Sequence, residues 1–295
     1  MVARLETQAV PSPIANDTKN LVFPFGKNWE KFVARITDDR IQQARTSLTG
    51  FMGVKDFVGK SFVDIGCGSG LFSYAAFLLG AKRLVSFDAD PFSVSCAHYL
   101  REKAGSPMHW TIHQGSVLDL DFLRSLKTFD IAYAWGVLHH TGNMWEAVRN
   151  SARLVADGGV YYIALYNRQE GMWGSQHWAR VKRYYNTSPR PVRRLMEWYY
   201  VLTRPVGRNL LRLRNPLKSI KEYGGRRGMH WKTDLVDWLG GYPYEYATVD
   251  EVSAFMKKEF ASFRLSNLKT ELGLGNNWYL YRNEILTYRP GGNHG

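Results

Sequence analysis

The stretch SFVDIGCGSGLFSYAAFLLG, residues 61–80, decides the fold of this chain. It begins with a short, mainly apolar run typical of a buried strand, and Leu71 opens a longer apolar run typical of a helix. Glycines stand between them at positions 66, 68 and 70. Glycine lets the backbone turn sharply and approach a ligand closely, and the start of a helix presents unpaired N–H groups to that ligand. The pattern predicts a strand–turn–helix unit with a ligand site at the turn.

The spacing of the glycines and a later aspartate narrow the kind of ligand. A dinucleotide fingerprint has the spacing GxGxxG, but here the third glycine comes one residue early and Leu71 occupies the expected place. Asp88 ends the next apolar run, 18 residues after Gly70, where a carboxylate can accept hydrogen bonds from ribose hydroxyls. The combination favours a nucleoside ligand without a pyrophosphate. The alternative is a structural glycine turn followed by a helix-capping aspartate.

The rest of the chain alternates short apolar runs with amphipathic segments, which predicts an α/β fold with a doubly wound parallel sheet. The expected strands are 61–65, 83–87, 109–113, 129–134, 159–166, 262–269 and 277–283. The expected helices are 28–48, as one helix or a broken pair ahead of Gly50 and Gly53, then 70–79, 91–103, 143–155 and 248–260. Thr248 and Glu251 have the spacing of a capping box, which marks the start of the last helix.

The alternation stops between Asn167 and Ala247, and this divides the chain. We predict a flexible leader at 1–20, an N-terminal helical cap at 21–58, a core formed by 59–167 and 248–288, and a basic, aromatic insertion at 168–247. Helices are expected inside the insertion at 175–186, 191–203 and 231–239.

Composition indicates a packed soluble protein, because 45% of the 295 residues are hydrophobic and 14% are aromatic. The net charge of +13 is concentrated: residues 172–232 hold 15 Lys or Arg against two Glu, an excess of 13. Cys67 and Cys96 lack the spacing of a metal site or a disulfide framework. No run has the length of a signal peptide or a membrane span, so we expect a cytoplasmic protein.

These residues resemble the class I S-adenosylmethionine-dependent methyltransferase family, particularly its branch of quinone and other small-molecule methylases. The resemblance covers about residues 60–166 and 248–284. It implies a Rossmann-like, seven-stranded sheet whose last strand is antiparallel, with the insertion serving as a mainly helical lid. The implied cofactor is S-adenosyl-L-methionine, with S-adenosyl-L-homocysteine as product and no metal.

The resemblance also implies the cofactor contacts. VDIGCGSG, residues 63–70, matches the family's first motif, in which Asp64 corresponds to the acid near the cofactor's amino group and Asp88 to the ribose acid. Ser116 stands where the family usually has an aspartate beside the adenine, so we expect the Val117 backbone to supply that contact. The run FDIAYAWGVLHHTG, residues 129–142, resembles the fourth-strand motif. The expected cofactor contacts are Trp29, Asp64, Gly66, Cys67, Gly68, Gly70, Asp88, Ala89, Ser116, Val117, Trp135, Gly136 and Leu138.

Methyl transfer from a sulfonium requires the protein to align donor and acceptor and, for a weak nucleophile, to remove a proton. Histidine suits this because its unperturbed pKa is about 6.5. The candidate catalytic residues are His140, His139, Tyr166 and His230, with Asn167 beside the acceptor and Asp234 orienting His230. The alternative is that the histidines only shape the pocket and that Tyr166 is structural.

The insertion leaves the acceptor open. Its arginines and aromatic side chains fit a small acceptor with anionic or aromatic groups. We favour this prediction and expect methylation on O or N. The basic lobe at 172–232 would also suit RNA, DNA or a protein, or the surface of an anionic membrane. Neither an RNA-binding module nor the signature of base amino-methylation is found. A binding protein without turnover remains a further alternative, and the oligomeric state is not readable.

Overall fold

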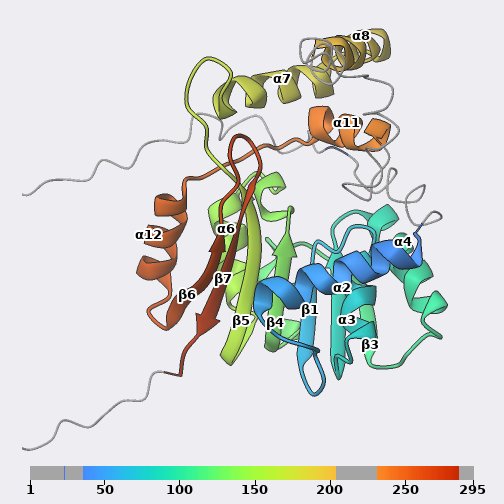
Figure 1. Cartoon of the computed structure of the whole chain (residues 1–295), viewed down its shortest axis with the longest axis vertical. Helices are drawn as coiled ribbons and strands as arrows, with labels where there is room; N and C mark the ends of the chain where they lie inside the picture. The colour runs from blue at the N-terminus through green and yellow to red at the C-terminus, as the bar shows by residue number, and fades with distance from the viewer. Residues whose placement is uncertain (1–22, 24–35, 204–230, 286–295) are drawn as a thin grey trace, which may run out of the picture.

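The computed structural model describes Phe23 and residues 36–203 and 231–285 (Figure 1). The predicted leader at 1–20, Trp29 and His230 lie outside these residues. Asp234 lies within a described helix, but its side chain is not described.

A seven-stranded sheet in the order β3-β2-β1-β4-β5-β7-β6 forms the centre of the fold. The strands β1 to β5 run parallel, whereas β7 is antiparallel to both of its neighbours, β5 and β6. The strands are β1 (Ser61–Ile65), β2 (Arg83–Asp88), β3 (Trp110–Gln114), β4 (Phe129–Trp135), β5 (Val155–Tyr166), β6 (Phe263–Lys269) and β7 (Asn276–Asn283). The predicted α/β sheet with an antiparallel last strand is confirmed. β5 starts earlier than predicted because Val155 pairs with Phe129 ahead of a register shift.

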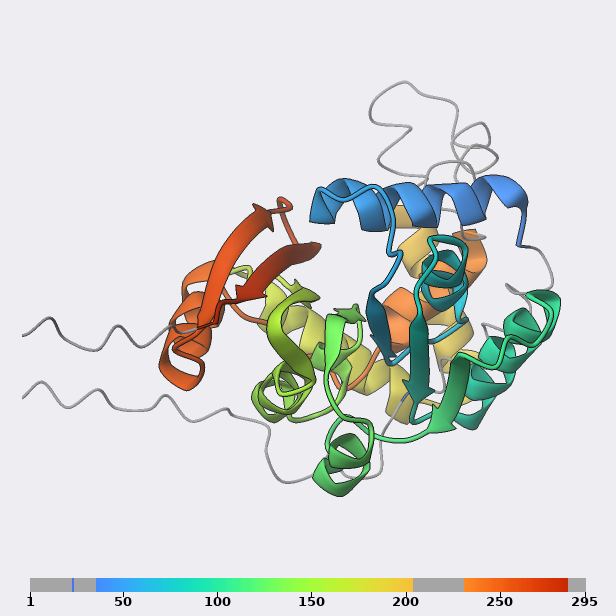
Figure 2. The same cartoon turned by 90° about the horizontal axis from the view of Figure 1, so that it is seen from below.

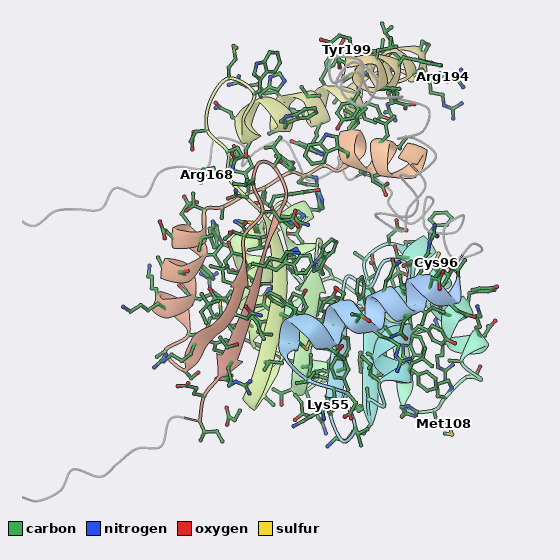
Figure 3. The ribbon with its side chains drawn as sticks, in the orientation of Figure 1. Lys55, Cys96, Met108, Arg168, Arg194 and Tyr199 are labelled. Carbon is green, nitrogen blue, oxygen red and sulfur yellow. The ribbon has the colours of Figure 1, made fainter. Side chains whose placement is uncertain are left out.

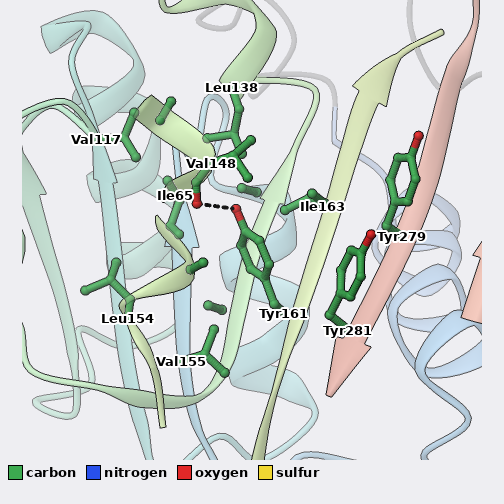
Figure 4. Packing of buried hydrophobic residues seen from close by; sticks show 14 of the residues in the cluster. Ile65, Val117, Leu138, Val148, Leu154, Val155, Tyr161, Ile163, Tyr279 and Tyr281 are labelled. Carbon is green, nitrogen blue, oxygen red and sulfur yellow. Dashed lines mark hydrogen bonds between the residues drawn. The ribbon is translucent and has the colours of Figure 1, made fainter. Parts of the chain in front are cut away.

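Helices cover both faces of the sheet (Figures 1 and 2). One face packs against α2 (Asp38–Met52), α3 (Leu71–Leu78) and α4 (Pro91–Lys103). The other packs against α5 (Leu120–Ser125), α6 (Met144–Ala152) and α12 (Val249–Glu259). Figure 4 shows the second core, where the Tyr161 hydroxyl donates to the Val148 carbonyl at 3.4 Å. The Thr248–Glu251 capping box of α12 is present as predicted.

Helices α2, α5 and α6 differ from the sequence prediction, and α6 ends at Ala152 instead of residue 155, where β5 begins. Helix α2 continues through Gly50, since Leu48 and Met52 lie four residues apart on its buried face and hold the intervening turn. It ends at Gly53, whose left-handed backbone lets its N–H donate to the Thr49 carbonyl. Helix α5 was not predicted, because it is short and begins at a capping residue, Asp119, in a stretch without clear periodicity.

The insertion contains α7 (Ser175–Thr187), α8 (Arg190–Val201) and α11 (Trp231–Gly240). These helices lie above the edge of the sheet where the parallel strands end (Figure 1). They share a separate apolar core that includes Trp178, Tyr185, Leu239 and Tyr244. Within the described parts of the chain, no helix combines the length and apolar character needed to cross a bilayer.

Candidate functional site

The predicted glycine turn connects β1 to α3 in a conformation that favours glycine. Gly66, Gly68 and Gly70 all have positive φ, at 66°, 52° and 76°. A Cβ on Gly66 would lie 2.2 Å from Cγ2 of Val137, in the loop after β4. A Cβ on Gly70 would lie 2.8 Å from the Ala97 Cα on α4. The turn therefore brings the ends of β1 and β4 and the face of α4 closer together than any other residue type allows.

Asp88 lies at the carboxyl end of β2, directly beside this turn. Its Oδ2 accepts a hydrogen bond from the Gly68 N–H at 2.9 Å, and its Oδ1 accepts one from the Asp90 N–H at 2.9 Å. Burial raises the pKa of Asp88 to about 6, against the opposing effect of these hydrogen bonds. Each carboxylate oxygen keeps a second lone pair, so the side chain fits a pair of ribose hydroxyls.

An open pocket of about 370 Å³ adjoins Asp88 at the end of β3. Its lining comprises Ala89, Gln114, Gly115 and Ser116. The Gly115 N–H donates to the Asp88 carbonyl at 3.0 Å, which joins the pocket to the carboxylate. The Ser116 hydroxyl accepts from the Leu118 N–H at 3.1 Å, so this loop is held by its own side chain. Two predicted contacts, Ala89 and Ser116, thus line one pocket together with Gln114 and Gly115, which the sequence reading did not select.

Asp64 is buried beneath the glycine turn, not at its surface. Its Oδ2 accepts a hydrogen bond from the Ser73 hydroxyl at 2.6 Å. The Ser73 hydroxyl in turn accepts one from the Ser86 hydroxyl, and the Ser86 hydroxyl accepts one from the Trp110 indole N–H. Burial raises the pKa of Asp64 to about 7. This chain of hydrogen bonds joins β1, α3, β2 and β3 below the turn, so Asp64 holds the turn in place as well as adding an acidic group there. Cys67, next to the turn, is also buried, and burial raises the pKa of its thiol.

Three further predicted contacts lie at the end of β4 and just after it. Trp135 is 37% exposed, with its ring between Phe72 of α3 and Trp278 of β7, at centroid distances of 6.4 and 6.0 Å. Gly136 follows with positive φ, and Leu138 is fully buried. Of the three contacts predicted here, Trp135 is therefore accessible, Gly136 forms a turn, and Leu138 belongs to the core.

His139 and His140 lie side by side just after β4, with ring centroids 4.5 Å apart. The His139 Nδ1 accepts from the Tyr166 N–H at 3.3 Å, so its proton is on Nε2, which is buried with no partner among the described residues. The His140 Nδ1 lies 2.6 Å from the Pro243 carbonyl. Because a carbonyl only accepts, that Nδ1 carries the proton and Nε2 is the basic nitrogen. The two adjacent imidazoles are thus fixed in opposite tautomers.

Both histidines are neutral at physiological pH. Burial lowers the pKa of His140 to about 3 and lowers the pKa of His139 well below its usual value. Lys182 adds a smaller effect of the same sign on both. A histidine with so low a pKa accepts a hydrogen bond but retains a proton poorly, which suits orienting an acceptor hydroxyl better than storing its proton.

A return segment of the insertion, residues 241–247, closes over this histidine pair. The Glu245 N–H donates to the His139 carbonyl at 2.9 Å, and the Ala247 N–H donates to the Tyr166 carbonyl at 3.0 Å. The Glu245 carboxylate accepts from the Met144 N–H at 3.0 and 3.1 Å. Burial raises the pKa of Glu245 to about 7. The return segment therefore joins the insertion to the ends of β4 and β5.

Tyr166 connects the histidines to the aromatic core of the insertion. Its ring lies 3.9 Å from His139 and 4.9 Å from Tyr244, measured between centroids. Lys182 is fully buried in that core, where its ammonium lies 4.1 Å from the Trp238 ring centroid and donates to the Trp238 carbonyl. Burial lowers the pKa of Lys182 to about 7. Asn167, by contrast, donates its side-chain amide to the Gly273 carbonyl and supports the loop before β7.

The structure thus brings most of the predicted residues to one edge of the sheet, in two adjacent groups. The glycine turn, Asp88 and the pocket form the first group, and His139, His140 and Tyr166 form the second. Sequence reasoning missed Lys182, Pro243 and Glu245. A glutamate within the aromatic run GYPYEYA was the one available signal. The roles of all these side chains stay predictions.

Comparisons with known proteins agree with this geometry. Residues 63–161 match the family described as "Methyltransferase domain". A ubiquinone biosynthesis O-methyltransferase of Methylobacterium sp. (strain 4-46) is 31% identical over 120 residues, 40% of this chain and 45% of the relative. A ribosomal protein L11 methyltransferase of Aeromonas salmonicida (strain A449) is 44% identical over 50 residues, 17% of each chain. The chain spans less than half the length of these curated relatives.

Solved structures share the fold at low sequence identity. The magnesium protoporphyrin IX methyltransferase ChlM of Synechocystis PCC 6803, with bound SAH, has a TM-score of 0.50 and 11% identity over 88% of this chain and 94% of its own. An O-methyltransferase family protein of Burkholderia thailandensis has a TM-score of 0.50 and 10% identity over 86% of this chain and 62% of its own. The sheet order and the glycine turn agree with the methyltransferase domain that residues 63–161 match, and the solved structures share this fold.

Proposed function

We propose that this protein transfers the methyl group of S-adenosylmethionine to a small-molecule acceptor. The observation that carries the proposal is the continuous arrangement of the glycine turn, Asp88 and the pocket on the ends of β1, β2 and β3. In this arrangement Asp88 would hold the ribose, the pocket would take the adenine, and the glycine turn would lie under the methionine portion. The cofactor supplies an electrophilic methyl group on a sulfonium.

The protein's own part in the reaction is alignment. His140 presents Nε2 as a hydrogen-bond acceptor, because the Pro243 carbonyl fixes its tautomer. His139 presents a buried N–H donor beside it. An acceptor hydroxyl or amine held by such groups keeps its lone pair directed at the methyl carbon, as in-line displacement requires. As the new bond to the methyl carbon forms, the carbon–sulfur bond breaks and S-adenosylhomocysteine leaves, while the acceptor's proton would pass to the His140 Nε2 and on to water. The aromatic core that includes Tyr244, with Tyr166 packed against it, gives these groups apolar surroundings.

Two observations favour a small acceptor over a macromolecule. The return segment packs against the histidine pair: the Glu245 N–H donates to the His139 carbonyl and the Pro243 carbonyl accepts from the His140 ring, so the insertion lies close over the proposed acceptor position. The longer curated match is to a protein named for ubiquinone biosynthesis, whereas the match to the ribosomal protein methyltransferase spans 50 residues. O-methylation is therefore the first choice to test, with N-methylation second.

Calorimetry with S-adenosylmethionine tests the donor site. We expect Asp88→Ala to weaken binding at least tenfold, about 1.4 kcal/mol, because the ribose loses its hydrogen-bond acceptors. Asp121→Ala, at a carboxylate whose side chain is 91% exposed and ion-paired with Arg124, is the matched control and should bind as wild type does. Absence of binding by the folded wild-type protein would overturn the proposal.

Labelled S-adenosylmethionine and a fractionated cell extract test the acceptor. We expect label in the small-molecule fraction, and less of it with His140→Ala at unchanged cofactor affinity. Label in RNA or protein would reject the small acceptor while keeping the methyltransferase. Binding without any transfer would make the chain a cofactor-binding protein instead.

A further inference from the structure

Helix α8 exposes its apolar side. Leu195, Trp198, Tyr199 and Leu202 follow one another at helical spacing, and they are 69%, 66%, 68% and 57% exposed. We call these four residues the α8 stripe. Single exposed apolar residues are ordinary, but a continuous row of large ones on one helix marks a surface that meets something apolar.

The opposite side of α8 holds the helix to the insertion. Met196, Tyr200 and Val201 pack against its aromatic core. The one carboxylate of α8, Glu197, accepts from the Tyr185 hydroxyl at 2.7 Å and is therefore turned inward. Figure 3 shows Tyr199 and Arg194 on the outer side of the helix, away from the sheet. The α8 stripe is thus presented outward by a helix fixed on its other side.

The surroundings of the stripe are strongly basic. Residues 171–203 contain six Lys or Arg, of which Lys182 is buried in the insertion core, and a single acid, Glu197. Arg190 and Arg194 are exposed on α8 itself, and Arg180 and Arg183 are exposed on the adjacent α7. Met172 and Trp173, just before α7, add further exposed apolar surface. Apolar side chains flanked by arginines complement a surface whose outer layer carries negative charge and whose inner layer is apolar.

We infer that α8 binds the surface of a bilayer containing anionic lipid, with the α8 stripe among the upper acyl chains and Arg190 and Arg194 against the phosphates. Tryptophan and tyrosine favour the boundary between headgroups and chains, and arginines gain from the negative surface potential. The two leucines distinguish lipid from RNA, since bases stack on aromatic rings and arginine but gain little from aliphatic side chains. This surface is separate from the methyl-transfer site, and the inference does not depend on that activity.

Vesicle flotation of the full-length protein tests this inference. We expect it to float with vesicles of phosphatidylcholine and phosphatidylglycerol, to float poorly with phosphatidylcholine alone, and to bind less as salt rises. Leu195→Ser/Trp198→Ser should weaken binding about tenfold or more through lost apolar burial. Arg194→Glu should abolish the preference for the anionic lipid.

Two exposed residues far from α8 supply matched controls. Met108 is 93% exposed and Lys55 is exposed at the opposite end of the molecule from α8 (Figure 3). Met108→Ser and Lys55→Glu make the same chemical changes there and should leave flotation unchanged. As a second readout, brominated lipids should quench the tryptophan fluorescence of the wild type more than that of Trp198→Phe.

Three results would overturn the inference. One is equal flotation by the wild type and the α8 variants. Another is tight, stripe-dependent binding to single-stranded RNA with no binding to vesicles. The third is a dimer in sedimentation that Leu195→Ser/Trp198→Ser dissociates, because the stripe would then be covered by a second copy of the chain.

Discussion

At the scale of single residues, the site depends on glycines, which have no Cβ. Gly66 lies so close to the loop after β4 that a methyl group there would overlap Val137. The same glycine lies two residues before Gly68, whose N–H donates to Asp88. One substitution at this position therefore changes both the packing of two strand ends and the shape of the proposed cofactor site.

We expect Gly66→Ala to lower the free energy of unfolding by more than Gly158→Ala does. Both glycines have left-handed φ, 66° and 73°, and share a backbone penalty of about 1–2 kcal/mol, but a Cβ on Gly158 meets nothing within 4 Å. The difference in urea denaturation isolates the collision with Val137. Gly66→Ala should also weaken cofactor binding, whereas Gly158→Ala should not. Equal losses of stability would show that the loop after β4 simply moves aside.

At the scale of elements, the return segment is what ties the insertion to the sheet. It contributes backbone hydrogen bonds to both histidines' surroundings, and Glu245 adds a carboxylate that caps the start of α6 through the Met144 N–H. Burial favours the protonated, uncharged form of such a carboxyl group. The attachment of the insertion is therefore coupled to pH.

Glu245→Gln tests this coupling. The pKa of Glu245 is raised from 4.5 to about 7, so its contribution to stability is complete below 4.5 and is lost as pH rises through about 7. We expect the melting temperature of the wild type to fall over that window relative to Glu245→Gln, which keeps the hydrogen bond without titrating. Glu259→Gln is the control of opposite sign, since Arg149 lowers the pKa of Glu259. Parallel curves for wild type and Glu245→Gln would contradict the coupling.

At the scale of the whole molecule, the two proposed ligand regions lie on one edge of the sheet but on different strands. The cofactor region uses the ends of β1, β2 and β3, whereas β6 and β7 lie beyond β5 on the other side. The acceptor region lies between them, at the ends of β4 and β5.

When S-adenosylhomocysteine is added, the rate of amide hydrogen exchange should therefore change in one part of the sheet and not in the other. We expect slower exchange at residues 66–70, 88–90 and 114–117, because a bound ligand stabilises the state that holds it. Strands β6 and β7 should change little. Protection confined to β6 and β7 would place the ligand elsewhere.

The cofactor side of the site could be predicted because it is local. Glycines at 66, 68 and 70 and Asp88 lie within one strand–turn–helix–strand unit, and the carboxyl ends of adjacent parallel strands meet at the same edge. The capping box of α12 was predictable for the same reason, since Thr248 and Glu251 are three residues apart.

The acceptor side could not be predicted because its contacts are distant in sequence. Pro243 meets His140 across 103 residues, and no spacing rule connects them. Lys182 is misleading, since a lysine on an amphipathic helix is expected on the outer face, whereas here it is buried under Trp238. Helix α2 similarly passes Gly50 because tertiary packing outweighs a local preference of about 1 kcal/mol.

The position of β7 has a consequence for the nascent chain. Strand β6 is synthesised before β7, but among the described residues it pairs with β7 alone, and β7 lies between β6 and β5. Until residue 283 has emerged from the ribosome, β5 carries an open edge through the middle of the protein, and such edges invite pairing with other chains. Because the last strand must reach back over more than a hundred residues, closure of the sheet is a late step with high contact order.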